Sequence, residues 1–282
     1  MALVEAMIEG PIQSVGVDPT GTGVELVAVG ARIRFVPGVT SSGRTRRIKT
    51  PTKTLIPAEL RDTAPLPGRS QIGFVGGTVI AEGRFDTDAR LMLADFLDVE
   101  PAETVLLGAL TQNDPGTPRQ LRINGVAIRM LTDRRLPANP ADPANPLFLN
   151  QYGFPMRIES ATLSPTGPTP NPPPAPSSAE GYFAGGVFHA FLFEYGETGV
   201  LLVDPATTPQ LSFKRASFRD EGTRIRFEAT GFLTTSHAPS GAPQNVELFR
   251  IDRDPVTGQL VETPIDRAAL DHQRQGEAEL RI

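Results

Sequence analysis

The sequence of 282 residues contains no cysteine. Disulfide bonds, thiolate nucleophiles and cysteine-ligated metal sites are therefore excluded. The compartment stays open, because a secreted domain that is large enough to form a hydrophobic core does not need disulfides. An apolar run of the ~20 residues that a membrane-spanning helix requires is also missing. The first residues, Met1–Glu5, lack the basic and apolar regions of a signal peptide, so we expect a cytosolic chain or an exported chain whose leader has been removed.

An excess of positive charge is missing as well. Lysine and arginine together number 27 and aspartate and glutamate 32, which gives a net charge of −5. This balance argues against a dedicated nucleic-acid-binding protein, whose domains concentrate Lys and Arg. The three histidines, His189, His237 and His272, lie in different segments without the spacing of metal ligands. We expect His189, which lies in a phenylalanine-rich strand, to be a packed or hydrogen-bonded side chain.

Motifs of known catalytic chemistry are not found in the sequence. There is no HExxH zinc motif, no phosphate-binding P-loop and no GxSxG nucleophile motif. Asp252–Gly258 has alternating carboxylates before a glycine, but it lacks the third carboxylate and the distal glutamate of a calcium loop. We interpret it as a hairpin turn, since Asp, Pro and Gly are turn residues. The sequence predicts no catalytic residue, no cofactor site and no metal site, and therefore no enzyme.

Glycine and proline, in contrast, are abundant, with 27 and 28 residues. Few long helical patterns persist in such a sequence, and an all-β structure with many turns is expected. The length of 282 residues is sufficient for two or three domains of this kind.

A repeat with an offset of about a hundred residues organises the first part of the chain. Glu82-Gly83 and Glu180-Gly181 occupy equivalent positions in two predicted hairpins, 98 residues apart (180 − 82). A period this long indicates a duplicated domain, because solenoid units repeat every ~20–50 residues. Three further pairs have offsets between 95 and 98 residues: Gly10 with Gly108, Gly30 with Gly125, and Ala94 with Ala190.

Each copy of the repeat predicts a small closed barrel. Glycine within a strand marks a bulge or a close approach of two backbones, and small barrels need such bends. About five bent strands in about a hundred residues favour an OB-like Greek-key barrel. We predict two tandem OB-like barrels, residues 1–104 and 105–205, with a proline-rich surface loop at 163–178. That loop favours polyproline II geometry, as a spacer or as a ligand of SH3-type domains.

The positions shared by the two copies also carry a resemblance to a known family. They are Gly10-Pro11, Val29-Gly30, Glu82-Gly83 and Ala94, with the counterparts Gly108, Gly125, Glu180-Gly181 and Ala190. In these positions the chain resembles OB-like β-barrel domains of unassigned function in bacterial secreted and surface proteins. The resemblance covers about two thirds of the chain. It implies an extracellular or cell-surface location and no catalytic residues.

The sequence pattern changes after Asp204–Pro209, which we interpret as a domain boundary. Residues 206–282 contain alternating segments with longer polar loops, as in an immunoglobulin-like β-sandwich. About five strands are expected there, against the seven of a constant-type immunoglobulin sandwich. A sandwich that is short of strands has an open edge, which favours pairing with a strand of another chain. The expected strands are Leu211–Phe218, Arg224–Phe232, Asn245–Asp252, Gln259–Glu262 and Glu277–Ile282.

The apolar segment Ala2–Ile8 has two interpretations. It is either the first strand of the first barrel or an arm that reaches a neighbouring subunit. Addition of such an arm to the open edge of a neighbour would produce a head-to-tail polymer. The candidate residues of this inter-subunit strand are Ala2, Leu3, Val4, Ala6 and Ile8.

Residues 40–53 form a basic segment. Its cations can form an electrostatic patch for nucleic acid, an anionic glycan or an acidic protein surface, or they can belong to a solvated loop. We favour the loop, because the aromatic side chains that nucleic-acid-binding surfaces combine with charge are missing nearby. Further along, Pro57–Arg61 predicts one helical turn, and Asp133-Arg134-Arg135 predicts a local ion pair of little value on a surface. The candidate patch residues are Arg44, Arg46, Arg47, Lys49 and Lys53.

These observations favour a non-enzymatic structural or interaction protein. We expect its partner to be another copy of the chain, joined by strand addition, as in a surface fibre. The alternative is a binding module that uses a barrel face for oligosaccharides or single-stranded nucleic acid, with Arg44–Lys53 at its rim. A hydrolase that uses dispersed carboxylates has the least support, and two carboxylates that face each other in a cleft would be needed to revive it.

Overall fold

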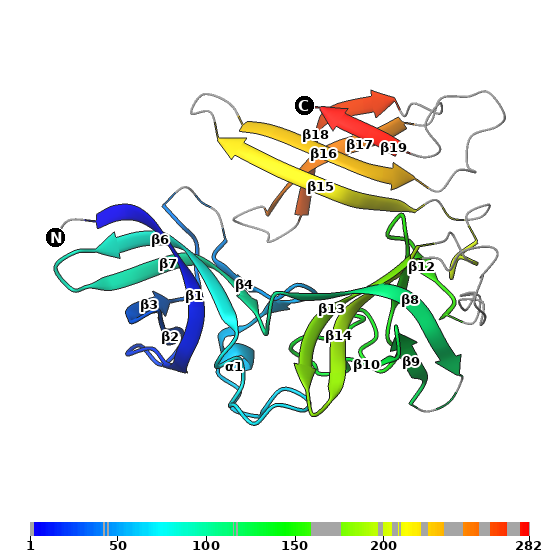
Figure 1. The fold of residues 1–282 in the computed structure, drawn as a ribbon. Coiled ribbons are helices and arrows are strands. Elements are labelled where there is room, and N and C mark those ends of the chain that lie inside the picture. Colours follow the sequence, from blue (N-terminus) through cyan, green and yellow to red (C-terminus); the bar gives the residue numbers. More distant parts are fainter. Residues whose placement is uncertain are drawn as a thin grey trace. The chain divides into compact units, whose positions relative to one another are not determined.

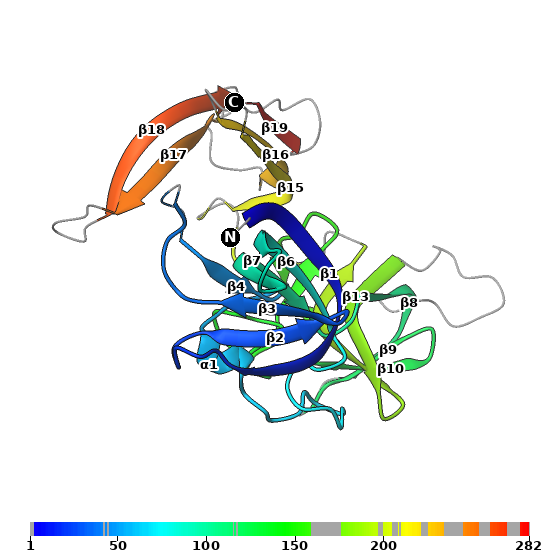
Figure 2. The same cartoon turned by 90° about the vertical axis from the view of Figure 1, so that its left-hand side faces the viewer.

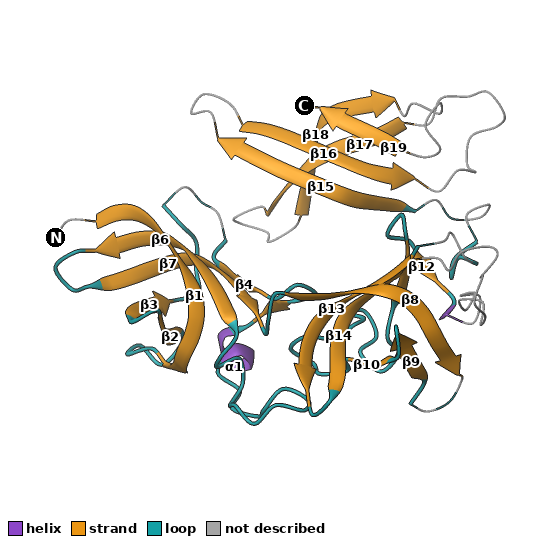
Figure 3. Ribbon diagram, viewed as in Figure 1, coloured by secondary structure: helices purple, strands orange, loops and turns teal. Residues whose placement is uncertain are grey.

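In the computed structural model the described residues form β-strands, connecting loops and short helical turns (Figures 1 and 3). The predicted all-β class is confirmed. The structure describes residues 3–41, 43, 45–114, 116, 118–158, 176–196, 200–204, 208, 210–220, 225–233, 245–253, 260–269 and 277–281.

The chain divides into two compact units. The first unit comprises Met1–Phe148 and Ala161–Gly196, and it contains the five barrel strands of each copy of the repeat. The second unit comprises Leu149–Ser160 and Glu197–Ile282, which include a short part of the second copy and the C-terminal strands. The two barrels therefore belong to one unit.

The first copy forms a closed five-stranded barrel. Its elements are β1 (Leu3–Val17), β2 (Val24–Ala28), β3 (Ala31–Phe35), β4 (Arg47–Lys49), β5 (Thr54–Leu55), α1 (Pro57–Leu60), β6 (Thr78–Asp86) and β7 (Leu91–Glu100). The long strand β1 pairs with β6 through its first half and with β2 through its second half, both antiparallel. The sheet order is β3-β2-β1-β6-β7, and parallel pairing of β3 with β7 closes the barrel. The short strands β4 and β5 extend the sheet beyond β7.

The second copy repeats this topology. Its elements are β8 (Thr104–Asp114), β9 (Gln120–Ile123), β10 (Val126–Met130), β11 (Phe148–Asn150), β12 (Pro155–Met156), β13 (Pro176–Ala184) and β14 (Val187–Tyr195). Its sheet order is β10-β9-β8-β13-β14, continued by β11 and β12. Parallel pairing of β10 with β14 closes this barrel at the same place as in the first copy. The predicted duplication is confirmed.

The glycines that revealed the repeat occupy equivalent bulges. The pairing register of β6 shifts between Glu82 and Gly83, and that of β13 shifts between Glu180 and Gly181. A Cβ atom on Gly83 would lie 2.2 Å from a backbone oxygen of β7, and one on Gly181 would lie 2.0 Å from a backbone oxygen of β14. Glycine is required at both positions because no other residue permits such an approach of the two backbones.

The β2–β3 and β9–β10 hairpins also turn at equivalent residues. Val29 and Gly30 have φ angles of 45° and 77°, and Asn124 and Gly125 have φ angles of 48° and 80°. Asparagine tolerates this left-handed region, whereas the β-branched valine is strained there. The side chain of Asn124 also accepts a hydrogen bond from the backbone N–H of Ala109 at 2.9 Å. The second copy therefore has the better turn residue.

The predicted helical turn at Pro57–Arg61 is confirmed as α1. Pro57 occupies the first helical position, where the missing N–H has no intrahelical partner to lose. The Glu59 carboxylate accepts a hydrogen bond from the backbone N–H of Ile56 at 3.1 Å, which caps the helix. The turn brings Leu60 into the core, where it is fully buried.

One hydrophobic cluster extends through both copies of the repeat. It includes the interior of the first barrel, Phe74 from the segment before β6, and four residues of the second copy. These four are Leu131, Leu136, Tyr182 and Phe191. The barrels therefore share buried apolar surface instead of being joined by a linker alone.

Beyond Asp204–Pro209 the described residues contain five strands near their expected places, and the strand expected at Gln259–Glu262 continues to Ala269. They are β15 (Leu211–Asp220), β16 (Ile225–Leu233), β17 (Asn245–Arg253), β18 (Leu260–Ala269) and β19 (Glu277–Arg281). They form a three-stranded sheet in the order β15-β16-β19 and a separate hairpin, β17–β18 (Figure 2). The expected strands are thus present, and the immunoglobulin-like sandwich stays a prediction.

Two predicted loops lie largely outside the described residues. Most of the proline-rich segment is among them, and Pro176 is the first residue of β13, a position at which a strand tolerates proline. Residues 254–258 of the calcium-like turn are also outside, between the antiparallel strands β17 and β18.

Candidate functional site

Two cations of the predicted basic segment form ion pairs within the first unit. Arg46 Nε lies 2.7 Å from Asp95 Oδ1, and Lys53 Nζ lies 2.6 Å from Glu59 Oε1. Lys53 also donates a hydrogen bond to the backbone oxygen of Arg134 at 3.0 Å. These side chains therefore connect elements of the unit instead of extending freely into solvent.

The remaining described cations of this segment also have contacts. Strand β4 pairs in parallel with β7, which places Arg47 opposite Phe96 and Lys49 opposite Asp98. The Arg47 guanidinium lies 5.5 Å from the centroid of the Phe96 ring, and Lys49 Nζ lies 3.9 Å from Asp98 Oδ1. Arg44 lies outside the described residues. The acidic residues of β7 and α1 thus offset much of the positive charge that the sequence suggested.

The structure places the N-terminal segment in the first barrel. Leu3 to Pro11 of β1 pair with β6, from Asp86 to Thr78, and β2 pairs only with the later part of β1. Among the described residues no strand pairs with the other edge of β1 before Ile12. Of the candidate inter-subunit residues, Leu3, Val4, Ala6 and Ile8 lie in this half-strand, and Ala2 is outside the described residues.

The second copy has the same open half-strand. Strand β8 pairs with β13 from Thr104 to Ala109 and with β9 only from Leu110 onward. Large apolar side chains are exposed on both half-strands, which is unusual for an unpaired sheet edge. They are Leu3, Val4 and Met7 on β1, with Met7 62% exposed, and Val105 and Leu107 on β8, with Leu107 68% exposed.

The junction between the two barrels is built around Arg135. This side chain is only 2% exposed, although the sequence predicted a surface ion pair. Its guanidinium donates to both carboxylate oxygens of Asp133, from Nε at 2.9 Å and from Nη2 at 2.7 Å. The local ion pair expected from the sequence is confirmed, but the expected surface location was wrong, because the loop that carries Arg135 is covered by the first copy.

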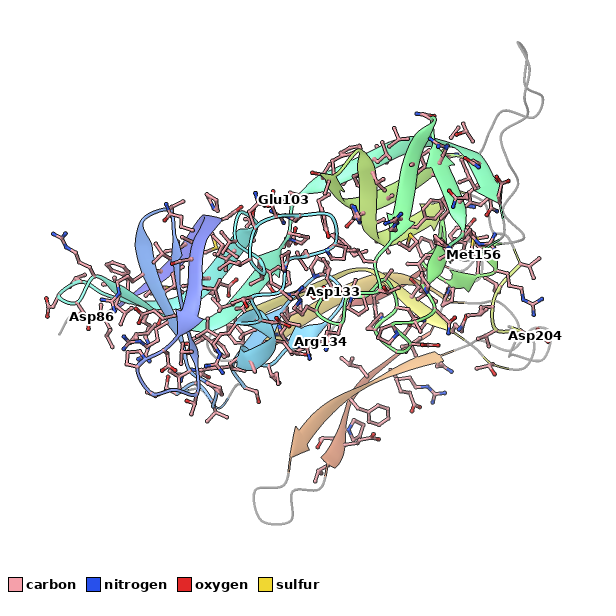
Figure 4. The ribbon with its side chains drawn as sticks, turned by 90° about the horizontal axis from the view of Figure 1, so that it is seen from below. Asp86, Glu103, Asp133, Arg134, Met156 and Asp204 are labelled. Atoms are coloured by element: carbon pink, nitrogen blue, oxygen red, sulfur yellow. The ribbon has the colours of Figure 1, made fainter. Side chains whose placement is uncertain are left out.

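The first copy supplies the other acceptors for Arg135. Nη1 donates to the backbone oxygens of Asp62 at 3.2 Å and Ala64 at 2.7 Å, and Nη2 donates to that of Pro65 at 3.4 Å. The guanidinium also lies 5.9 Å from the centroid of the Phe74 ring. A side chain of the second copy thus satisfies three backbone acceptors of the first, in the region where Figure 4 labels Asp133 and Arg134.

The charges at this junction stabilise each other. Burial would raise the pKa of Asp133, but hydrogen bonds from Arg135 outweigh burial and hold that pKa below its ordinary value. The adjacent residue Arg134, in contrast, is exposed to solvent. Its side chain is 69% exposed and pairs with the Asp62 carboxylate at 2.7 Å. Two adjacent arginines of the same loop therefore have a buried and a solvent-exposed role.

A second contact between the copies lies at Tyr182 and His189. The Tyr182 hydroxyl donates a hydrogen bond to the backbone oxygen of Pro67 at 3.0 Å, and the Arg69 guanidinium lies 5.4 Å from the centroid of the Tyr182 ring. His189 stacks on Tyr182, with ring centroids 5.3 Å apart and planes inclined by 13°. His189 is 3% exposed, so the expectation of a packed histidine is confirmed.

The outer faces of the two barrels differ in charge. In the first barrel Glu25 accepts hydrogen bonds from Arg32 and Arg34, with Nη2 of each at 2.9 and 2.8 Å. The position equivalent to Glu25 in the second barrel is Gln120, and that of Arg34 is Arg129. The second face therefore lacks the carboxylate that neutralises the first.

Arginines of the second face are held without a carboxylate. Arg122 donates to the Gln112 side-chain oxygen and to the backbone oxygen of Gly125, each at 2.7 Å. In the part of the chain that the structure describes, neither Arg122 nor the exposed Arg129 forms an ion pair. These two side chains, here termed the β9–β10 cations, lie outside the basic segment and were not predicted from the sequence. Comparison of Glu25 with Gln120 in the aligned copies could have found them.

Carboxylates gather where the first copy continues into the second, near Glu103 in Figure 4. Burial, then repulsion from Glu103, Glu180 and Asp98, raises the pKa of Glu100. Burial, then repulsion from Glu194, raises the pKa of Glu180. Ionisation of Glu100 and Glu180 therefore lowers the free energy of unfolding.

The described residues contain neither a metal-binding group nor a membrane-spanning helix. Within them, no group of three or more His, Asp or Glu side chains is placed to hold a metal ion. None of their helices is long and apolar enough to cross a membrane. No protein-family model, no curated protein and no solved structure matches the chain.

Proposed function

We propose that the chain is a non-enzymatic structural protein that associates with copies of itself through strand edges. The observation that carries this proposal is the open half-strand that recurs in β1 and β8, each with exposed apolar side chains. Edges of natural sheets are usually protected by lysine, proline or a covering element. Leu3–Gly10 contains no lysine or proline, and its charged residues are the exposed Glu5 and Glu9.

The strand order supports an OB-like assignment for the two barrels. Numbered within each copy, the five barrel strands follow the order 3-2-1-4-5, with strands 3 and 5 parallel. In the first copy α1 lies between strands 3 and 4. An immunoglobulin-like C-terminal domain with an open edge would supply a further pairing surface.

The experiment is a measurement of assembly with single lysine substitutions. We expect the purified chain to form concentration-dependent oligomers in light scattering, and Met7→Lys and Leu107→Lys to reduce them, since a charge at an edge opposes strand pairing. Ile72→Lys is the matched control, because Ile72 is an exposed apolar residue (50%) outside both half-strands. Monomers at every concentration, or equal effects of all three substitutions, would contradict the proposal.

A second candidate function is binding of an anionic oligosaccharide or single-stranded nucleic acid. The β9–β10 cations favour it, because the face of an OB-like barrel formed by its second and third strands is a ligand surface. The basic segment is less suited, since its described cations have partners.

This candidate is tested by binding of a single-stranded oligonucleotide and a sulfated oligosaccharide across a salt series. Binding should weaken steeply as salt rises. It should be lost in Arg122→Ala/Arg129→Ala and retained in Arg32→Ala/Arg34→Ala, whose guanidinium groups pair with Glu25. Equal loss in both double variants would exclude the β9–β10 cations as the site.

A further inference from the structure

His189 occupies a buried contact between the two copies of the repeat. It lies in β14, and the segment Leu66–Arg69 of the first copy packs against it. Gly68 approaches so closely that a Cβ atom there would lie 2.6 Å from His189 Nε2. Tyr182 holds the same segment through its hydrogen bond to Pro67. The segment, here termed the docked segment, therefore depends on the ring of His189 for part of its packing.

The surroundings of His189 are suited to a neutral ring. Its Nδ1 atom is buried and has no hydrogen-bond partner among the described residues. The hydrogen bond that the ring makes goes to the backbone of Ala184. A protonated imidazole has two N–H donors, so protonation would leave one donor buried without an acceptor.

The charged groups around the ring also oppose protonation. Strand β10 places Arg129 next to His189 in the parallel pairing with β14, and the docked segment contributes Arg69 near the Tyr182 ring. From β13, the neutral Tyr182 hydroxyl donates to a backbone oxygen. The ion pair of Asp133 with Arg135 acts on Tyr182, and its two charges offset each other. No carboxylate in the described part of the chain forms an ion pair with His189.

We propose that His189 makes the contact between the docked segment and the second barrel sensitive to acid. Protonation of the ring favours a state in which Leu66–Arg69 has left β14 and the imidazolium is solvated. This inference does not depend on self-association, because it concerns a contact within one chain.

The direction of the effect follows from linkage. Burial, and then the charge of Arg129, lowers the pKa of His189 in the docked state, whereas a solvated histidine has a pKa of about 6.5. Above that value both states are neutral and docking is independent of pH. Below it the open state binds a proton that the docked state does not, so the opening equilibrium constant rises, by up to about tenfold per pH unit.

Hydrogen exchange of the Arg69 amide measures this opening directly. That amide donates to the Leu66 backbone oxygen at 3.0 Å, so its protection reports on the docked segment. We expect its protection factor, corrected for the intrinsic pH dependence of exchange, to be nearly constant from pH 8 to 7 and to fall about fivefold between pH 6.5 and 5.5.

Histidine variants separate His189 from the other titrating groups. His189→Phe keeps an aromatic ring beside Tyr182 and should show no fall over this range, whereas His237→Gln/His272→Gln should behave as the natural chain. A fall of equal size in His189→Phe, or constant protection in the natural chain, would overturn the inference.

A second measurement applies even if His189→Phe does not fold. The pKa of His189 in the natural chain can be followed by the NMR shifts of its ring. We expect a value below 6.5, together with loss of the docked-segment signals as the ring titrates. A value at or above 6.5 with the segment still docked would also overturn the inference.

Discussion

Replacement of Arg135 by methionine removes the polar centre of the junction between the barrels. Methionine retains the unbranched apolar part of the side chain, so the loss is mainly that of the guanidinium. The change leaves the backbone oxygens of Asp62, Ala64 and Pro65 without the guanidinium donor, and it leaves the Asp133 carboxylate with only the backbone N–H of residue 135. Removal of one partner of a buried ion pair costs about 3–5 kcal/mol. We expect Arg135→Met to lower the free energy of unfolding by that amount.

The assay is urea unfolding followed by circular dichroism, with Arg134→Met as the control. Arg134 is adjacent in sequence and also pairs with a carboxylate, but its side chain is 69% exposed. A surface pair contributes about 0–1 kcal/mol, so the control should be close to the natural chain.

The double variant Asp133→Asn/Arg135→Met tests the cause of the loss. It removes the unpaired buried charge, and we expect it to be more stable than Arg135→Met alone, with a coupling energy of about 1–3 kcal/mol. A loss below about 1 kcal/mol in Arg135→Met, or equal losses at Arg134 and Arg135, would refute the role assigned to the buried guanidinium.

Three further predictions concern the bulges, a turn and the acidic region. Gly83→Ala and Gly181→Ala should each lower the free energy of unfolding by about 2 kcal/mol or more, whereas Gly16→Ala, whose Cβ would have no neighbour nearer than 3.9 Å, should cost less than about 1 kcal/mol in the same urea titration. Val29→Asn should raise it by about 1 kcal/mol, because asparagine tolerates the φ of 45° that strains valine. Glu100→Gln should raise the free energy of unfolding at pH 7 by about 0.5 kcal/mol, which is observed as a higher thermal midpoint. The folded-state pKa of Glu100 is raised, so its ionisation costs stability above pH 4.5, and the gain should vanish below that pH in calorimetry.

The duplication could be predicted because it depends on backbone geometry. Gly83 and Gly181 are fixed by the approach of a carbonyl oxygen from the neighbouring strand, a constraint that no other residue satisfies. Alternating apolar residues likewise predicted the five C-terminal strands, since period-two patterns are local. Features that depend on the alternation within one strand, or on the bulge of one hairpin, could therefore be predicted from the sequence.

The junction could not be predicted, because its partners are distant along the chain. Arg135 and the backbone oxygens of Asp62 to Pro65 are separated by at least 70 residues. Backbone acceptors carry no side-chain signal, so only the local partner of Arg135, Asp133, could be predicted. The ion pairs of the basic segment could not be predicted for the same reason, because Asp95, which pairs with Arg46, is 49 residues away.

The shared core of the two barrels limits which surfaces of the duplicated copy can bind a new partner. A separate barrel can keep one ligand face per copy, but here the second copy uses its loop at Asp133–Leu136 and residues of β13 and β14 to bind the first. Those surfaces are therefore committed to the junction in one orientation. The face formed by β9 and β10 remains outside the junction, and there Gln120 replaces the Glu25 that neutralises the first copy. The two copies thus differ in charge on a surface that the junction leaves accessible, and we expect a new partner to bind there.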